Sequence, residues 1–454
     1  MYKIVILMVW SSMITCTLPA QLQPENKRNR PPNVILIYSD DHGTFDLNCY
    51  GAKDLHTPNL DQLASSGIQF TQFYASSPIC SPSRASLLTG RYPQRAGLPG
   101  NAPSEFGSAG MPAGQLTLAE LFKQGGYQTA HFGKWHLGYS PETMPNQQGF
   151  DYSYGFMGGC IDNYSHYYYW GGPNRHDLWR NGTQIWEPGE YFPKRITGEA
   201  IEYIERNQDN PFFIYWASNT PHYPLQPEPD WVRYYQHLPM PRRLYAASLS
   251  SMDEKIGQIL GKLKELGLAE NTIVIFQGDQ GHSEEERAFG SGGFSGPFRG
   301  SKFSLLEAGI RVPAIISWPS TIPAGQYRDQ FATNIDWFPT LASFCSLPQP
   351  DRKIDGKNLR NIIDSETAGS PHPYFFWQSL GSAEHPQWAV RKGPWKLMHR
   401  PIGLSITELF KERFFLVNLE TDSAEQFNLA DRYPSMVDSL EKNYEAWIGE
   451  VESQ

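Results

Sequence analysis

Three apolar runs that each end in polar residues constrain the fold of this chain most. They are NVILIYSDDHG (33–43), PFFIYWASNTPH (211–222) and NTIVIFQGDQGH (271–282). Each run is continuously apolar or aromatic before its polar end, which is typical of strands buried on both faces of a parallel sheet. The runs therefore predict the central strands of a sheet that is covered by other elements.

The segments between these runs carry helix signals. TPNLDQLASSG (57–67) begins with a threonine N-cap and a proline at the first helical position. TLAELFKQGG (117–126) has the capping box Thr117 with Glu120, and segment 244–267 has apolar residues at helical spacing. Strands that alternate with helices predict an α/β fold with a large, mostly parallel sheet flanked by helices.

Beyond Pro373 the pattern changes. QWAVRKGPWKLMHR (387–400) and RFFLVNLETD (413–422) read as antiparallel strands, and 433–451 reads as a closing amphipathic helix. A chain of 454 residues is long enough for one large domain and a smaller one. We expect a catalytic domain over 33–372 and a C-terminal α+β subdomain over 373–454.

The N-terminus indicates export. Lys3 precedes the apolar run IVILMVWSSMIT, which is as long as the core of a signal peptide and too short to span a membrane comfortably. We expect a signal peptide at 1–20 and a flexible leader at 21–32, with lipoprotein-type anchoring at Cys16 or a buried N-terminal strand as alternatives. The mature protein is expected in the periplasm or secreted, without stable membrane insertion. The net charge of −9 disfavours a nucleic-acid partner.

The cysteines are too few for a disulfide framework. The chain has five, and removal of Cys16 with the signal peptide leaves Cys49, Cys80, Cys160 and Cys345. One bridge, 49–160 or 160–345, is compatible with this count, and no cysteine pair has the spacing of a zinc site.

Oxygen ligands follow two of the predicted strands. Asp40 and Asp41 end the first run, and Asp279 and Gln280 end the third. In an open α/β sheet the carboxyl ends of parallel strands share one edge, where ligands bind. Carboxylate and amide oxygens suit a hard cation such as calcium or magnesium, although an Asp-Asp pair is also common in turns and helix caps.

Cationic and histidine side chains follow the same pattern. GKWHLG carries Lys134 and His136, which point the same way if the loop is extended, and His222 ends the second run. Arg84 and Lys302 add positive charge. Each of these residues alone reads as a surface charge or a structural histidine, but together they predict an oxyanion site with acid–base groups.

Two motifs resemble a known family. CSPSRASLLTGR (80–91) is similar to the signature of the type I, formylglycine-dependent sulfatases, and GYQTAHFGKWHLG (126–138) is similar to their second signature. The resemblance covers nearly the whole chain after residue 33, including 414–430. It implies the alkaline phosphatase-like fold and the hydrolysis of sulfate esters.

The resemblance implies a modified residue at position 80. In this family a formylglycine-generating maturation enzyme oxidises the cysteine of Cys-x-Pro-x-Arg, here Cys80, Pro82 and Arg84, during export. The hydrated aldehyde has two hydroxyls on one carbon, of which one attacks sulfur and the other expels sulfate afterwards. Because Pro82 suits the first turn of a helix, Cys80 is expected at or just before the helix N-terminus, which favours an anion.

The resemblance also assigns roles to single residues. Residue 80 and four further side chains would bind one divalent cation, calcium first and magnesium second; these four are Asp40, Asp41, Asp279 and Gln280. Arg84 and Lys134 would hold residue 80, His136 would assist its second hydroxyl, and His222 and Lys302 would bind sulfate. His222 is also the expected proton donor to the leaving oxygen.

Two positions depart from the family pattern. Position 280 is a glutamine where asparagine is commoner, and the usual Glu-Gly-Gly reads Glu-Ala-Gly at 307–309. The longer side chain of Gln280 keeps an amide oxygen, so we retain this residue among the expected ligands.

The expected substrate is a sulfated saccharide, desulfated at a chain end. DNYSHYYYWGGPNRHDLWRNG (162–182) is rich in tyrosine and tryptophan beside Asn, Asp, Arg and His, a mixture that suits the apolar faces and hydroxyl edges of sugars. These rings could equally bury the loop against the domain. Alternatives are a phosphonate or phosphodiester hydrolase of the same superfamily, a non-catalytic binder of sulfated glycans, and a sulfatase for lipids or steroids.

Overall fold

The computed structural model describes residues 30–382, 385–403 and 412–453. The expected signal peptide, most of the leader and the alternative anchor at Cys16 lie outside these ranges. Across the described helices, none is both long enough and apolar enough to cross a membrane.

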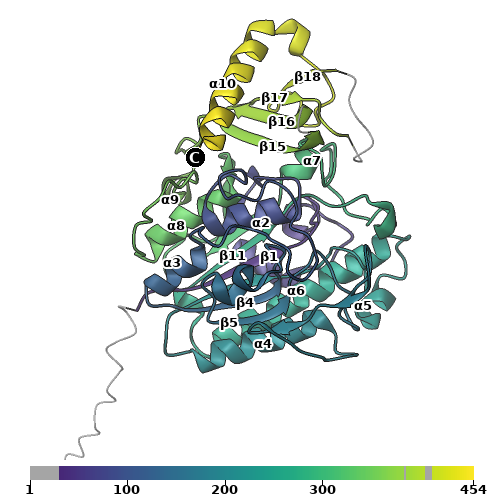
Figure 1. Cartoon of the computed structure of the whole chain (residues 1–454), viewed down its shortest axis with the longest axis vertical. Helices are drawn as coiled ribbons and strands as arrows, with labels where there is room; N and C mark the ends of the chain where they lie inside the picture. The colour runs from purple at the N-terminus through teal and green to yellow at the C-terminus, as the bar shows by residue number, and fades with distance from the viewer. Residues whose placement is uncertain (1–29, 383–384, 404–411, 454) are drawn as a thin grey trace, which may run out of the picture. The chain divides into compact units, whose positions relative to one another are not determined.

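A sheet of ten strands organises the larger part of the chain (Figure 1), in the order β13-β2-β12-β11-β1-β10-β4-β5-β8-β9. Its centre is five parallel strands, namely β11 (Thr272–Gly278), β1 (Asn33–Ser39), β10 (Phe212–Ala217), β4 (Gln128–Lys134) and β5 (Tyr152–Phe156). The three apolar runs thus form neighbouring strands, and the predicted α/β fold is confirmed.

The edges of this sheet are mixed. On one side lie β12 (Ala314–Ser317), β2 (Ile68–Phe70) and β13 (Gln326–Arg328), and on the other β8 (Trp179–Arg180) and β9 (Thr183–Gln184). The pairs β11–β12, β12–β2, β5–β8 and β8–β9 are antiparallel. The other short strands are β3 (Phe73–Tyr74), β14 (Ala332–Thr333), β6 (Tyr167–Tyr168) and β7 (Arg175–His176).

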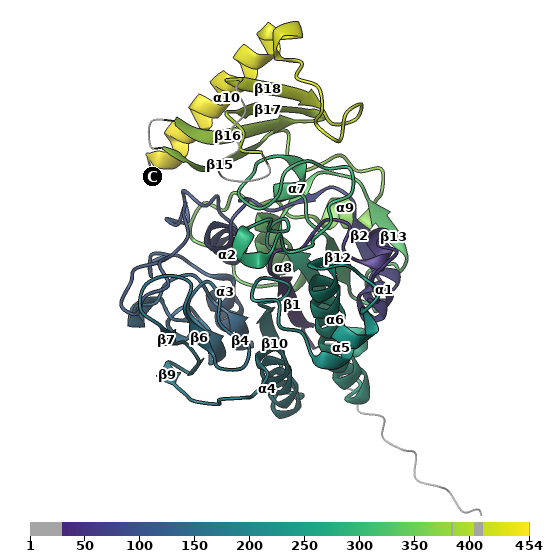
Figure 2. The ribbon, with the colours of Figure 1, turned by 90° about the vertical axis from the view of Figure 1, so that its right-hand side faces the viewer.

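Helices cover both faces of the sheet. Along β1, Val34, Leu36 and Tyr38 point into one core, while Ile35 and Ile37 point into another. The first core is closed by α2 (Cys80–Thr89), α3 (Leu118–Gln124) and α8 (Trp337–Phe344) (Figure 1). The second is closed by α1 (Pro58–Ser65), α4 (Phe192–Arg206) and α6 (Arg242–Glu265) (Figure 2). This two-sided burial explains why the strand sequences are continuously apolar.

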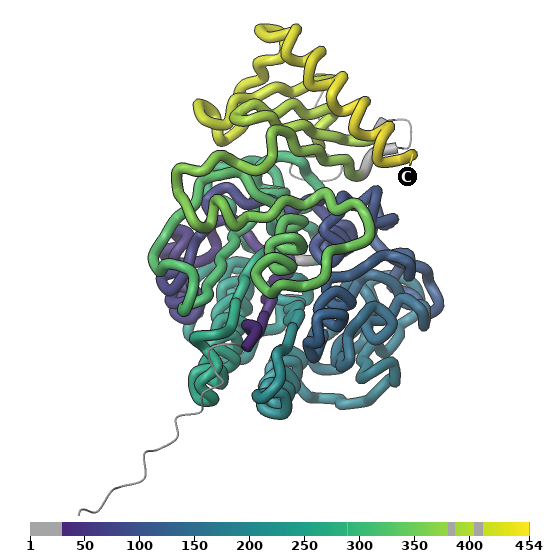
Figure 3. Tube along the Cα trace, turned by 90° about the vertical axis from the view of Figure 1, so that its left-hand side faces the viewer, coloured from purple at the N-terminus to yellow at the C-terminus, as the bar shows by residue number. Residues whose placement is uncertain are grey.

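The C-terminal part forms a second sheet. Its antiparallel strands are β15 (Phe375–Ser382), β16 (His385–Lys392), β17 (Trp395–His399) and β18 (Phe414–Asn418), and α10 (Pro434–Glu452) lies along them (Figures 2 and 3). Trp377 and Leu416 share one buried cluster with Tyr74 and Leu305 of the larger part. The boundary at 372/373 itself stays a prediction. Three further α-helices of the described residues are short, namely α5 (Pro229–Tyr234), α7 (Glu307–Ile310) and α9 (Arg360–Asp364).

Cys49, Cys80, Cys160 and Cys345 are all free thiols. Three of them lie in different environments: Cys49 packs beside the α4–α6 core, Cys160 against Tyr223, and Cys345 in the α3–α8 core. Neither of the bridges compatible with the sequence, 49–160 or 160–345, is therefore formed.

Candidate active site

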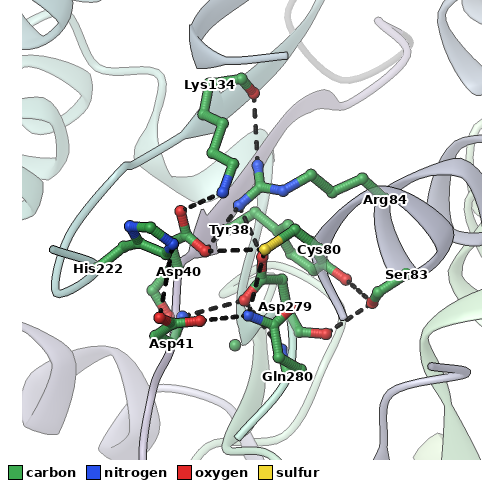
Figure 4. Close-up of polar contacts among 12 residues, drawn as sticks. Tyr38, Asp40, Asp41, Cys80, Ser83, Arg84, Lys134, His222, Asp279 and Gln280 are labelled. Atoms are coloured by element: carbon green, nitrogen blue, oxygen red, sulfur yellow. Dashed lines mark hydrogen bonds and ion pairs between the residues drawn. The ribbon is translucent and has the colours of Figure 1, made fainter. Parts of the chain in front are cut away.

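The expected site residues follow the carboxyl ends of the central parallel strands. β1 leads directly into Asp40 and Asp41, β4 ends at Lys134, β11 leads into Asp279, and the loop after β10 carries His222. Because these strands are parallel, the side chains meet at one edge of the sheet, as the sequence predicts (Figure 4).

Cys80 stands at the start of α2. Ile79 is the N-cap in extended conformation, Cys80 is the first helical residue, and Pro82 lies in the first turn, as expected. The Cys80 Sγ atom lies 3.8 Å from Asp40 Oδ1 and 3.6 Å from Gln280 Nε2. Burial raises the pKa of the thiol to about 11, so the unmodified side chain is a poor nucleophile.

Two cations pair with Asp40 and Asp279. Lys134 Nζ donates to Asp40 Oδ2 at 2.7 Å, and Arg84 Nη2 donates to Asp279 Oδ2 at 2.8 Å and lies 3.6 Å from Asp40 Oδ1. The side chains of all four residues are fully buried. Burial alone would raise the pKa of Asp40, but the positive charges around it, Lys134 first, hold that pKa well below its ordinary value.

Asp41 pairs with Lys302 and lies near His222. Its backbone has a φ of +61°, and its carboxylate lies 2.9 Å from Lys302 Nζ and 3.7 Å from His222 Nε2. Gln280 Nε2 lies 2.5 Å from Asp41 Oδ1. Burial raises the pKa of Asp41 to about 6, and the nearby charge of Asp40 acts in the same direction.

Asp279 and Gln280 complete the acidic edge. Asp279 Oδ1 accepts hydrogen bonds from the backbone N–H groups of Asp41 (3.1 Å) and Gln280 (2.9 Å). Burial, with the charge of Asp40 next, raises the pKa of Asp279 to about 8. The Oε1 atom of Gln280 is buried and has no hydrogen-bond partner among the described residues.

The donor atoms at this edge fit a hard cation. Asp40, Asp41, Cys80 and His222 each offer one ligand-type atom within 4.8 Å of the others, and all four residues are buried. Rotation of the Gln280 amide would turn its unpartnered oxygen toward Asp41 and Cys80 and add a further oxygen donor. Asp279 is not part of the four-residue group, so its expected place among the ligands stays a prediction.

His136 differs from its expected geometry. Its φ is +54°, so the loop after β4 is not extended there and the simple alternation with Lys134 does not hold. The ring is buried, and its Nδ1 atom has no hydrogen-bond partner among the residues that the structure describes. None of the described polar contacts joins the ring to Cys80. Burial, followed by the charge of Lys134, lowers the pKa of His136 well below its ordinary value.

Several residues that support the site were not singled out from the sequence. Ser83 Oγ donates to the backbone oxygen of Asp279 at 2.6 Å, and Asn334 Nδ2 donates to the backbone oxygen of Ser83 at 2.9 Å. Tyr245 OH donates to the backbone oxygen of Asp41 and accepts from the Gly43 N–H, both at 3.1 Å. Of these residues, only Ser83 has a signal in the sequence, namely its place in CSPSR. The others bind residues more than 200 positions away, so no local pattern reveals them.

Aromatic side chains lie next to His222. The centroid of the Tyr223 ring lies 4.1 Å from that of His222 and 5.8 Å from that of Trp170. Trp170 in turn stacks on Tyr169, with 4.4 Å between the ring centroids. Arg287 lies over the face of Tyr223 at 4.8 Å. Part of the aromatic loop 162–182 thus extends outward from the polar cluster, and Tyr169 is exposed to solvent.

The sulfatase family profile matches residues 32–345, which contain all of this geometry. The chain belongs to the sulfatase family. A second profile, N-sulphoglucosamine sulphohydrolase, C-terminal, matches residues 300–447 of the sulfatase.

Relatives of this sulfatase act on different sulfates, as their names state. The chain is 34% identical to steryl-sulfatase of Homo sapiens, over 76% of this chain and 72% of that protein. It is 37% identical to N-acetylgalactosamine-6-sulfatase of Sus scrofa, over 81% of this chain and 72% of that one. The crystal structure of Ps i-CgsB in complex with k-i-k-neocarrahexaose superposes with a TM-score of 0.83 at 29% identity, covering 92% of the sulfatase and 93% of that chain.

Proposed function

We propose that this sulfatase removes sulfate from saccharides at a chain end, with formylglycine at position 80 and one divalent cation, calcium before magnesium. The observation that carries the proposal is the cluster of polar side chains around Cys80, which stands at the start of a buried helix. Asp40 and Gln280 contact Cys80, and Asp41 contacts Gln280. Lys134 and Lys302 pair with the two aspartates. The signature around Cys80 supports the modification.

The cation would be held by Asp40, Asp41, Asp279, Gln280 and residue 80. When bound, it would polarise the sulfate group and favour the ionised form of the nucleophile. His222, which belongs to the four-residue group at this edge, contributes a nitrogen atom, and calcium and magnesium prefer oxygen. We therefore assign His222 to the substrate.

Two positively charged side chains favour a negative charge at residue 80. Lys134 and Arg84 are buried beside Asp40, whose Oδ1 lies 3.8 Å from Cys80 Sγ. The hydrated aldehyde would add the nucleophilic hydroxyl and a second hydroxyl for release of sulfate. We propose that Lys134 and Arg84 orient this group and stabilise its developing charge, and that His136 assists the second deprotonation.

His222 and Lys302 are assigned to the sulfate and its leaving oxygen. The Nδ1 atom of His222 lies 2.7 Å from the backbone oxygen of Tyr223, which can only accept, so Nδ1 carries a hydrogen. The Nε2 atom lies 3.7 Å from Asp41 Oδ2. A proton would pass from Nε2 to the leaving oxygen only from the doubly protonated ring. Burial, followed by the charge of Lys302, lowers the pKa of His222 and opposes this form, whereas the negative charge of a bound sulfate would favour it. Lys302 Nζ lies within hydrogen-bond distance of both oxygens of the Asp41 carboxylate, and its charge would bind a sulfate oxygen.

The aromatic side chains beside His222 support a saccharide substrate. Tyr223, Trp170 and Tyr169 form a continuous series of rings that begins at the polar cluster and ends at the surface. Rings of this kind pack against the apolar faces of sugars while neighbouring polar groups bind hydroxyls. The structural relative bound to k-i-k-neocarrahexaose is consistent with this substrate class.

A panel of substrates tests the proposal. Sulfated mono- and oligosaccharides, nitrophenyl sulfate, a steroid sulfate and a nitrophenyl phosphodiester would be compared by kcat/KM. We expect the largest value for a saccharide, because contacts with the remote sugar lower the transition-state energy. Equal values for nitrophenyl sulfate and every saccharide would contradict the saccharide assignment. A preference for the phosphodiester or the steroid sulfate would replace it.

A further inference from the structure

The segment that carries Lys302 is hydrogen-bonded to the C-terminal sheet. Gln387 of β16 donates from Nε2 to the backbone oxygen of Phe303 at 2.7 Å, and its Oε1 accepts from the Leu305 N–H at 3.3 Å. Glu425, in the loop after β18, accepts from the Glu307 N–H at 2.6 Å. Backbone groups of residues 303–307 therefore depend on side chains more than 80 residues later in the chain.

The other side of the same segment faces the active site. Lys302 Nζ lies 2.9 Å from Asp41 Oδ1 and 3.0 Å from its Oδ2. The backbone N–H of Lys302 donates to the backbone oxygen of His282 at 2.8 Å. The position of the ammonium group therefore depends on the backbone to which the side chain is attached.

Phe303, the next residue, has an unusual backbone conformation. Its φ is +78°, and its backbone N–H donates to the oxygen of Pro78 at 2.9 Å, two residues before Cys80. A phenylalanine rarely adopts this conformation and keeps it only where surrounding contacts hold it.

Gln387 is placed to hold this conformation. The residue is 1% exposed, and its Oε1 also accepts from the Ile402 N–H at 3.3 Å. Because the residue is almost fully buried, loss of its side chain would leave the Phe303 oxygen and the Leu305 N–H without these partners. The least costly response is movement of the 303–305 backbone, which carries Lys302 with it.

We infer that Gln387 is a positioning residue for Lys302, so that the C-terminal sheet is part of the catalytic apparatus. The inference rests on the proposed function, which assigns Lys302 to sulfate binding. Gln387 itself touches neither Asp41 nor Cys80 in any described contact, and it acts through the backbone of residues 303–305.

A double-mutant cycle tests the inference. Gln387→Met keeps the length of the side chain and removes both polar groups, and Lys302→Ala removes the positioned ammonium. We expect Gln387→Met to lower kcat/KM about tenfold, with a raised KM, and to cause no further loss in the Lys302→Ala background, because residues that act as one unit are not additive. Equal losses in the two backgrounds would overturn the inference.

Asn428, exposed in the loop after β18, offers a control with the same pattern of hydrogen bonds. Its Oδ1 accepts from the N–H groups of Leu416 and Ala430, both at 3.0 Å, and its Nδ2 donates to the Phe414 oxygen at 2.8 Å. Asn428→Leu thus removes the same three kinds of hydrogen bond without touching the Lys302 segment. We expect its kcat/KM to match that of the unmodified sequence.

Hydrogen exchange gives a readout that does not require turnover. Amide exchange in peptides covering 300–309 should rise in Gln387→Met and stay unchanged in Asn428→Leu; unchanged exchange in both would overturn the inference. If Gln387→Met does not fold, Gln387→Glu serves instead, since it keeps the acceptor and loses the donor to Phe303. Failure of the proposed function looks different, because then Lys302→Ala alone would leave sulfate hydrolysis unaffected.

Discussion

Removal of the buried ammonium of Lys396 should destabilise the protein in a pH-dependent way. Lys396 Nζ lies 3.0 Å from Glu307 and 2.8 Å from Glu425, and the side chains of all three are fully buried. Lys396→Met would leave the two carboxylates with the positive charges of Arg311, which is 3.3 Å from Glu307, and of Arg391. Breaking a buried ion pair by removing one partner costs about 3–5 kcal/mol of unfolding free energy.

The pH dependence follows from the two carboxyl groups. Burial, with Glu307 acting in the same direction and Lys396 opposing it, raises the pKa of Glu425 to about 7, so the folded protein binds this proton more tightly than the unfolded chain does. Its contribution to stability is therefore complete below its ordinary pKa and is lost as pH rises through about 7. Glu307 behaves oppositely: burial alone would raise its pKa, but Lys396 and Arg311 lower it to about 2, so its contribution is lost as pH falls toward that value.

Urea unfolding followed by tryptophan fluorescence would measure these effects at about pH 5 and about pH 8. We expect Lys396→Met to cost more at the higher pH, where Glu425 would be ionised without a partner, and Lys396→Met/Glu425→Gln to recover much of the loss. Lys392→Met, on the exposed side of the neighbouring strand β16, is the control and should change stability by no more than about 0.5 kcal/mol. An equal loss at both pH values, or no recovery in the double variant, would refute the reasoning.

Two further predictions concern the cation and the substrate. Chelation should abolish sulfate hydrolysis and lower the Tm, because a ligand of the folded state is withdrawn. Added calcium should restore both the activity and the Tm. An unchanged Tm in metal-free, inactive protein would contradict this account. Trp170→Ala should lower kcat/KM for a sulfated saccharide about tenfold, the size expected for one lost ring contact, and leave nitrophenyl sulfate hydrolysis unchanged. Trp186→Ala, which removes a ring that is 61% exposed, is its control, and equal losses on both substrates in Trp170→Ala would count against a sugar contact.

The sequence predicts the sheet centre and the side chains that follow it, for a physical reason. A strand buried on both faces must be continuously apolar, so β1, β10 and β11 are visible as uninterrupted runs. Parallel strands place their carboxyl ends together, and this rule alone brings Asp40, Lys134 and Asp279 to one edge.

Contacts that depend on tertiary packing are not visible in the same way. The positive φ of His136 breaks an alternation that holds for extended backbone alone. Gln387, Lys396 and Glu425 lie in strands and loops with no motif, and their contacts with residues 303–307 join segments about 80 to 120 residues apart. No local pattern encodes such contacts, because each depends on how the second sheet packs against the first.

The chemical state of residue 80 tests the central proposal most directly. The protein would be produced with a formylglycine-generating enzyme, and the tryptic peptide that ends at Arg84 would be analysed by mass spectrometry alongside kcat for a sulfate ester. We predict an aldehyde in place of the Cys80 thiol, a kcat proportional to the fraction converted, and no turnover by Cys80→Ala, which should fold normally. Full activity in protein whose residue 80 is entirely unmodified cysteine would contradict the account.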